Sequence, residues 1–156
     1  AKAIDIAITE DADIINLSLG SAQQDRLVSN LITRASQGGL QLVAPAGNNP
    51  QSLTMAFPAS HPEVIAVAGF DEANNPLPNQ TVAQRADAAA PSIGIFSTIP
   101  GNKHNFHDGT SFSAATISGL IALSLQNRPN SAPVPFPHFD KETPWQLQVT
   151  AFLGLP

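Results

Sequence analysis

The segment DGTSFSAATISG, residues 108–119, places a Gly-Thr-Ser triplet directly before a run of alanine, serine and glycine. The apolar pattern continues to residue 127, and it predicts a helix from Ser111 to about Asn127 that is apolar on nearly every side. We expect such a helix to be central and buried. A hydroxyl at the start of a helix is either a cap for its free backbone N–H groups or a nucleophile.

The segments before this helix alternate between strand and helix patterns. Helical spacing of apolar residues marks an opening helix over residues 1–10 and a second helix within residues 25–39. Short apolar runs that end in small residues predict buried strands at 13–20, 40–46 and 64–70, and residues 86–101 predict one or two more. Residues 71–84 are typical of turn and loop. Strands and helices of these lengths in this order predict an α/β fold with a mostly parallel sheet.

Composition limits the organisation of the chain and its partners. The length of 156 residues suits one main domain, which we place at residues 1–128. Prolines recur after it, and residues 129–156 are expected to form an extension, with a final helix within WQLQVTAFL (145–153). The net charge of −5 argues against nucleic acid and anionic membranes as partners, and no apolar run is long enough to span a bilayer. The chain begins mid-pattern without methionine, so we expect a processed or truncated N-terminus.

Several stretches together resemble the subtilisin-like serine proteases, the subtilases. GTSFSAATISG (109–119) is similar to the nucleophile motif of that family, LVAPAGN (42–48) to its oxyanion-hole motif, and DIINLSLG (13–20) to its peptide-pairing strand. FPASHPEVIAVAG (57–69) and APSIGIFSTIPG (90–101) match its connecting segments in the same order. Each motif alone is weak, since a lone helix-start serine is usually a cap and a lone asparagine before Asn-Pro is usually a turn residue. The resemblance covers about residues 1–127.

The resemblance implies a fold and a set of site residues. The fold is α/β and three-layered, with a mostly parallel sheet and a central buried helix, and it is incomplete because the N-terminal strands are missing. Ser111 is the implied nucleophile, and its backbone N–H and the side-chain amide of Asn48 would bind the oxyanion. The implied substrate-binding residues are Ser18, Leu19, Gly20, Ala46, Gly47 and Thr110. Residues 44–47 and 56–59 would wall an uncharged, apolar pocket, which Ala56 makes shallower where the family commonly has glycine.

A serine nucleophile also needs a base and an orienting acid. The family supplies them from an Asp-[Ser/Thr]-Gly strand end and a His-Gly helix start, and neither motif occurs in this chain. His107 lies four residues before Ser111, and its side chain is expected to point away from the Ser111 hydroxyl. We therefore expect the second half of a serine endopeptidase catalytic domain, inactive until an N-terminal segment with Asp and His completes it. The alternatives are a non-catalytic peptide-binding or assembly module, which the absence of the family's proline at Ala115 leaves open, and an inert fragment.

The remaining expectations concern partners and location. A peptide or protein is the expected substrate, and the exposed edge of an apolar sheet is expected to be covered by the missing N-terminal half or by a second copy of the chain. The residues predict no cofactor and no metal-ligand cluster, while the resemblance raises a structural calcium bound by backbone carbonyls at residues 57–62. It also favours an extracellular or periplasmic location.

Overall fold

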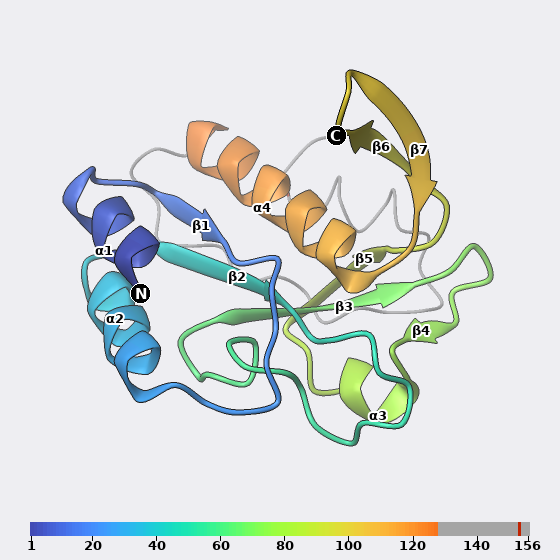
Figure 1. Cartoon of the computed structure of the whole chain (residues 1–156), viewed down its shortest axis with the longest axis horizontal. Coiled ribbons are helices and arrows are strands. Elements are labelled where there is room, and N and C mark those ends of the chain that lie inside the picture. Colours follow the sequence, from blue (N-terminus) through green and yellow to red (C-terminus); the bar gives the residue numbers. More distant parts are fainter. Residues whose placement is uncertain (128–152, 154–156) are drawn as a thin grey trace.

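A computed structural model describes residues 1–127 and residue 153 (Figure 1). Its centre is a five-stranded sheet in which β1 (Ile14–Asn16), β2 (Gln41–Pro45), β3 (Ile65–Phe70) and β5 (Ala88–Pro91) are parallel, each paired to the next. The short β4 (Pro76–Leu77) pairs antiparallel with β3. These elements confirm the predicted α/β fold with a mostly parallel sheet.

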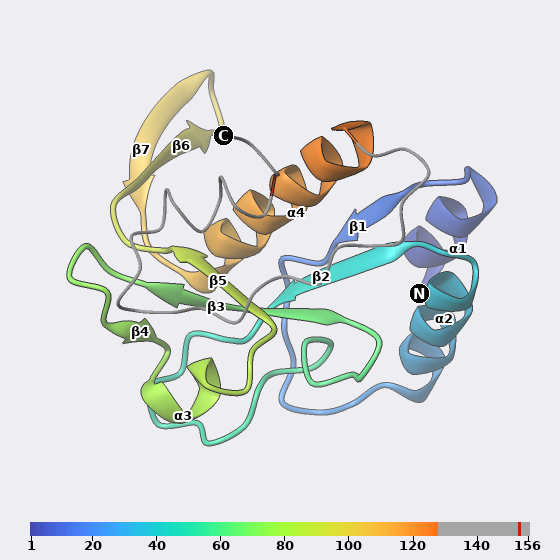
Figure 2. The ribbon, with the colours of Figure 1, turned by 180° about the vertical axis from the view of Figure 1, so that it is seen from behind.

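Helices cover both faces of this sheet (Figures 1 and 2). Helices α1 (Lys2–Thr9) and α2 (Arg26–Gln37) pack on one face, and α4 (Thr110–Asn127) packs across β1, β2, β3 and β5 on the other. The side chain of Asp25 caps α2 by accepting a hydrogen bond from the Val28 N–H at 2.8 Å. The short α3 (Gln80–Ala83) follows β4. No described helix is long and apolar enough to cross a membrane.

The strands alternate their side chains between the two helical layers. On β2, Leu42 and Ala44 belong to the core beneath α1 and α2, whereas Val43 belongs to the core beneath α4. On β3, Ala68 belongs to the core beneath α1 and α2, and Val67 belongs to the core beneath α4. Successive side chains of a strand point to opposite faces, so an uninterrupted apolar strand serves two cores at once. This arrangement confirms the three-layer architecture.

The first turn of α4 lies very close to the sheet because the facing residues are small. Ser113 is fully buried, and its hydroxyl donates to the carbonyls of Ala90 at 3.0 Å and Pro91 at 3.1 Å. The backbone of Gly69 lies against Ser92, whose backbone carbonyl accepts a hydrogen bond from the Gly109 N–H at 2.7 Å. The start of α4 therefore packs directly against the ends of β3 and β5.

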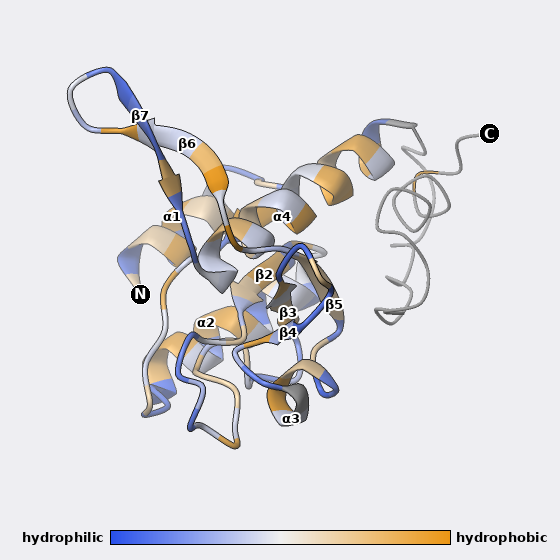
Figure 3. Cartoon of the chain, turned by 90° about the vertical axis from the view of Figure 1, so that its right-hand side faces the viewer, coloured by the Kyte–Doolittle hydropathy of each residue, from blue (hydrophilic) through white to orange (hydrophobic). Residues whose placement is uncertain are grey.

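The structure differs from the sequence-based expectations at three places, and a fourth expectation lies outside the described residues. The strand predicted at 13–20 ends at Asn16 in β1, and the chain then leaves the sheet. Residues 71–84, predicted as turn and loop, include β4 and α3. An antiparallel hairpin of β6 (Ile95–Ile99) and β7 (Lys103–His107) stands out from the body (Figure 3), and its second strand lies beyond the strands predicted within residues 86–101. The predicted final helix lies in a region that the structure, apart from residue 153, does not describe.

Helix α4 packs against the centre of the sheet as predicted, but within the described residues only one of its sides is buried. Ala114 and Ile117 face the sheet and are fully buried, whereas Leu123 is 48% exposed. The exposed positions of α4 are Ala115, Thr116, Gly119, Ala122, Leu123 and Gln126. Their spacing places them along one side of the helix. The apolar sequence therefore reflects a second face that no described residue covers.

The close approach at Gly69 gives a test of this packing. A Cβ added at Gly69 would lie 2.5 Å from the Ser92 Cβ and would overlap its hydroxyl. We expect Gly69→Ala to lower the free energy of unfolding by about 2 kcal/mol or more, because overpacking in a dense core forces side chains and backbone apart. Urea denaturation measures this loss.

A second substitution identifies the cause. Adding Ser92→Gly to Gly69→Ala removes the overlapping atoms and should restore part of the lost stability. The matched control is Gly119→Ala on the exposed side of α4, where an added Cβ meets nothing within 4 Å. That variant should be neutral or more stable by up to about 1 kcal/mol, because alanine favours the helix. Equal losses for both alanine variants would contradict the packing argument.

Candidate active site

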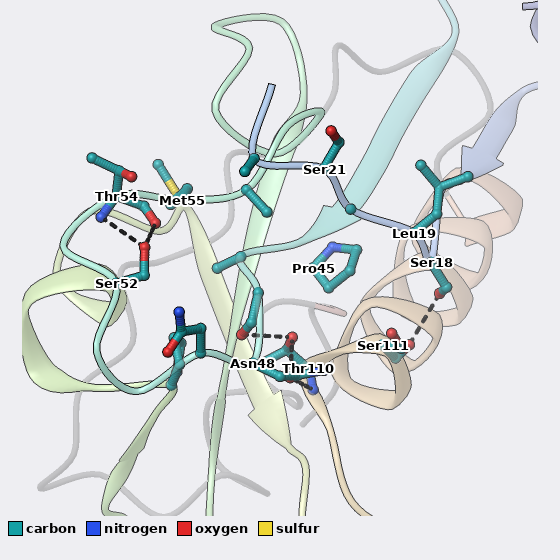
Figure 4. A pocket seen from close by; sticks show the side chains of 17 residues that line it. Ser18, Leu19, Ser21, Pro45, Asn48, Ser52, Thr54, Met55, Thr110 and Ser111 are labelled. Carbon is teal, nitrogen blue, oxygen red and sulfur yellow. Dashed lines mark hydrogen bonds between the residues drawn. The ribbon is translucent and has the colours of Figure 1, made fainter. Parts of the chain in front are cut away.

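A pocket of about 490 Å³ opens at the carboxyl ends of β1 and β2, beside the start of α4 (Figure 4). Ligand sites of parallel sheets typically lie at this edge. The lining residues are all uncharged: Ser18, Leu19, Gly20, Ser21, Ala22, Pro45, Ala46, Gly47, Asn48, Asn49, Ser52, Thr54, Met55, Ala56, Pro78, Thr110 and Ser111. The structure thus brings together the residues that were given catalytic or substrate-binding roles, whereas only part of the predicted walls lines the pocket. The roles given to those residues remain predictions.

Asn48 and Thr110 join the end of β2 to the start of α4. The Oδ1 of Asn48 accepts hydrogen bonds from the Thr110 N–H and from the Thr110 hydroxyl, each at 2.9 Å, and the same hydroxyl lies 3.1 Å from the Gly47 carbonyl. A backbone N–H can only donate, so the atom that faces it must be the carbonyl oxygen of the amide. The Asn48 Nδ2 is therefore the end of the amide that remains to donate, and no hydrogen bond engages it within residues 1–127.

Two glycines make this arrangement possible. Gly47 has φ +115° and Gly109 has φ +140°, both in the region that L side chains rarely adopt. A Cβ at Gly109 would also lie 3.3 Å from the Asn48 Nδ2. Side chains at either position would strain the two turns that bring Asn48 to the helix.

Ser111 lies in the first turn of α4 and is half-buried. Its backbone carbonyl accepts a hydrogen bond from the Ser18 hydroxyl at 3.1 Å, and the Asn16 Nδ2 donates to that hydroxyl at 3.0 Å. The start of α4 is thus hydrogen-bonded to the end of β1 through Ser18. Sequence reasoning missed Asn16, although a polar residue inside an apolar strand was a signal for it. The unpaired N–H groups at a helix start favour negative charge at this position.

No histidine in the described chain is bonded to the Ser111 hydroxyl. The His107 ring stacks on Phe112 with centroids 5.2 Å apart, and its Nε2 is buried without a hydrogen-bond partner in the described residues. The neighbouring Asp108 accepts from the Gly94 N–H at 2.9 Å. His61 is buried in a turn, where its Nδ1 accepts from the Glu63 N–H at 3.3 Å. His138 lies outside the described residues.

The walls of the pocket differ in part from the prediction. Ala44 and Ala59 are buried in the core beneath α1 and α2 rather than in the pocket. Their places are taken by residues that the sequence did not indicate: Asn49, Ser52, Thr54, Met55 and Pro78. Ala56 does lie in the wall, and a Cβ added at Gly20 would be 3.2 Å from the Ala56 Cβ. The described residues contain no cluster of three or more His, Asp or Glu side chains that could hold a metal ion.

Known protein sequences that match this chain agree on one family. The sequence model of the subtilase family matches residues 1–149. Subtilisin of Bacillus pumilus is 32% identical over 129 residues, which are 81% of this chain and 47% of that protein. The thermophilic serine proteinase of Bacillus sp. (strain AK1) is 37% identical over 131 residues, 83% of this chain and 32% of that protein.

Solved protein structures that resemble this chain include two proteases. The self-cleaved protease domain of PatA has a TM-score of 0.73 and 32% identity, covering 86% of this chain and 54% of that one. The prenylagaramide maturation protease PagA has a TM-score of 0.72 and 28% identity, covering 86% and 52%. This chain therefore spans between about a third and about half of the length of the relatives it matches.

The Thr110 hydroxyl provides a test of how the site is held. Thr110→Val keeps the shape of this fully buried side chain but removes the donor to Asn48 and Gly47. We expect a loss of about 1–3 kcal/mol in the free energy of unfolding, because a buried acceptor loses its partner. Thr116→Val, which removes an exposed hydroxyl that bonds only the carbonyl four residues before it, should change stability by less than about 0.5 kcal/mol. Similar effects of the two variants on urea denaturation would contradict this view of the site.

Proposed function

This chain belongs to the subtilase family, and from that premise we propose that it supplies the nucleophile and the oxyanion-binding groups of a serine endopeptidase. The observation that carries the proposal is the pairing of Asn48 with the start of α4, which leaves an amide N–H donor and a serine hydroxyl beside one uncharged pocket. A peptide-binding module needs the pocket but has no need of this pair.

The proposed reaction is acyl transfer. The Ser111 Oγ attacks the carbonyl carbon of a peptide bond, forming a C–O bond while the hydroxyl proton passes to a base. Negative charge develops on the carbonyl oxygen, and the Asn48 Nδ2 and the Ser111 backbone N–H would donate to it. The C–N bond then breaks, the amine leaves with the proton from the base, and water releases the acyl group by the reverse steps.

We propose that the base and its orienting acid come from a chain segment outside these 156 residues. No described histidine is bonded to Ser111, and the described residues leave two features uncovered, one on β1 and one on α4. Within the described residues, β1 pairs only with β2, so its other edge has free backbone donors and acceptors. The exposed side of α4, around Gly119, provides small side chains against which another element can pack. A second copy of the chain is the alternative occupant.

The substrate proposal follows from the lining of the pocket. An extended peptide would pair with the backbone of residues 18–20, which lies exposed at the pocket after β1 ends. The side chain before the cut bond would enter the uncharged pocket, so we propose an apolar residue at that position. An extracellular or periplasmic location belongs to the same proposal.

The test compares this chain with a longer chain, here called the parent, in which the proposed segment with Asp and His precedes residue 1. We expect chromogenic peptides with an apolar residue before the cut bond to be cleaved by the parent and not by residues 1–156 alone. In the parent, Ser111→Ala should abolish turnover, and Asn48→Ala should lower kcat by about 10²–10³-fold, the loss known for such a donor in subtilisin itself.

Asn30→Ala, an exposed position on α2 away from the pocket, should leave kcat unchanged. A parent that keeps its activity after Ser111→Ala would overturn the proposal. Turnover by the isolated chain that disappears on Ser111→Ala would instead place the base inside it, with His107 as the candidate.

A further inference from the structure

The outer wall of the pocket is a loop without regular structure, residues 49–55, here called the rim loop. In Figure 4 its residues Ser52, Thr54 and Met55 lie across the pocket from Ser18 and Ser111. Within the loop, Asn49 accepts from the Ser52 N–H at its carbonyl (3.1 Å) and from the Gln51 N–H at its Oδ1 (3.0 Å). The Ser52 hydroxyl donates to the Thr54 carbonyl at 2.7 Å and accepts from the Thr54 N–H at 3.3 Å, so the carbonyls of Pro50, Ser52 and Leu53 have no partner inside the loop. A loop of this kind needs outside partners for its remaining carbonyls.

Those partners come from the segment around α3. The Asn79 Nδ2 donates to the carbonyl of Pro50 at 3.0 Å and to that of Ser52 at 2.8 Å. Arg85, just after α3, donates from Nη1 to the Leu53 carbonyl at 3.3 Å. Asn79 does not line the pocket itself, although the preceding Pro78 does. Its amide therefore reaches the pocket only through the rim loop.

The same side chain has a second, separable task. The Asn79 Oδ1 accepts a hydrogen bond from the Val82 N–H at 3.0 Å and so caps α3. One end of the amide thus fixes the helix, and the other end holds two carbonyls of the rim loop. Aspartate and serine are good helix caps, but an aspartate cannot donate and a serine is too short to reach both carbonyls.

We propose that Asn79 is a positioning residue that fixes the rim loop and thereby sets which sizes of apolar side chain the pocket accepts. This inference rests on the proposed protease function for its substrate, but its structural part does not. A wall held at two carbonyls has one shape, and a fixed wall discriminates between side chains that differ by a few methylene groups. Without the two hydrogen bonds, the wall can yield to larger residues.

The structural part is tested on the chain itself with Asn79→Asp and Asn79→Ser. Amide exchange measured by NMR should accelerate at least about tenfold at Gln51 and Ser52 in both variants, because the rim loop opens more readily. Exchange at Val82 should stay unchanged, since both replacements keep the cap. Asn30→Asp, the same exchange of amide for carboxylate at an exposed position on α2, should change neither.

The specificity part is tested on the parent protein with a peptide series whose residue before the cut bond is Ala, Val, Leu or Phe. The spread of kcat/KM is the ratio of its highest to its lowest value across the series. In both Asn79 variants this ratio should fall by about tenfold. The change should lie in KM for the larger residues, and kcat for the alanine peptide should be unchanged. Asn30→Asp should keep the spread of the unaltered parent.

The possible results test the structural part and the specificity part of the proposal separately. Unchanged exchange at Gln51 and Ser52 in either variant would overturn the proposal, and so would faster exchange with an unaltered spread of kcat/KM. An effect of Asn79→Asp alone would assign the change to the new charge and reject the positioning role. A parent that cleaves no peptide would refute the protease function, while the exchange data would still decide whether Asn79 holds the rim loop.

Discussion

Thr110 donates two hydrogen bonds to one atom, the Oδ1 of Asn48, and the geometry of the site depends on this pairing. Thr110 is fully buried, so its N–H and hydroxyl must find acceptors inside the protein. The acceptor lies on the segment after β2, which fixes the distance between that strand and α4. The flanking turns then require positive φ angles, which explains the glycines at 47 and 109. The orientation of the Asn48 amide follows from the same bond.

Small residues extend this constraint into the core. Gly69, Ser92 and Ser113 allow the first turn of α4 to approach the sheet, and the Ser113 hydroxyl bonds carbonyls at the end of β5. Dense packing of this kind resists movement, since even one added methyl group has no space. The site is therefore built on rigid elements beneath Ser111. On the opposite side of α4, Gly119 has open space around it.

The pocket combines this rigid base with a less regular wall. Its floor is formed by residues after β1 and β2, whereas the rim loop depends on side-chain hydrogen bonds from Asn79 and Arg85. The two parts have different origins, because the floor follows from the parallel sheet and the rim loop from contacts between distant loops. Variation in the wall can thus alter what the pocket accepts while Asn48 and Ser111 keep their places.

The sequence by itself determined the order of the main elements, the helix that starts at the Gly-Thr-Ser triplet and the group of residues around the pocket. Those features are local, because apolar runs, helix spacing and the motifs around Asn48 and Ser111 are written in contiguous residues. Only the tertiary structure decided the early end of β1, the hairpin of β6 and β7, the open side of α4 and the bonds of Asn79 to the rim loop. Most of these features depend on contacts between residues that are distant in sequence. The open side of α4 depends on the lack of a covering element among the described residues, because an apolar helix pattern does not say how many faces of the helix are covered.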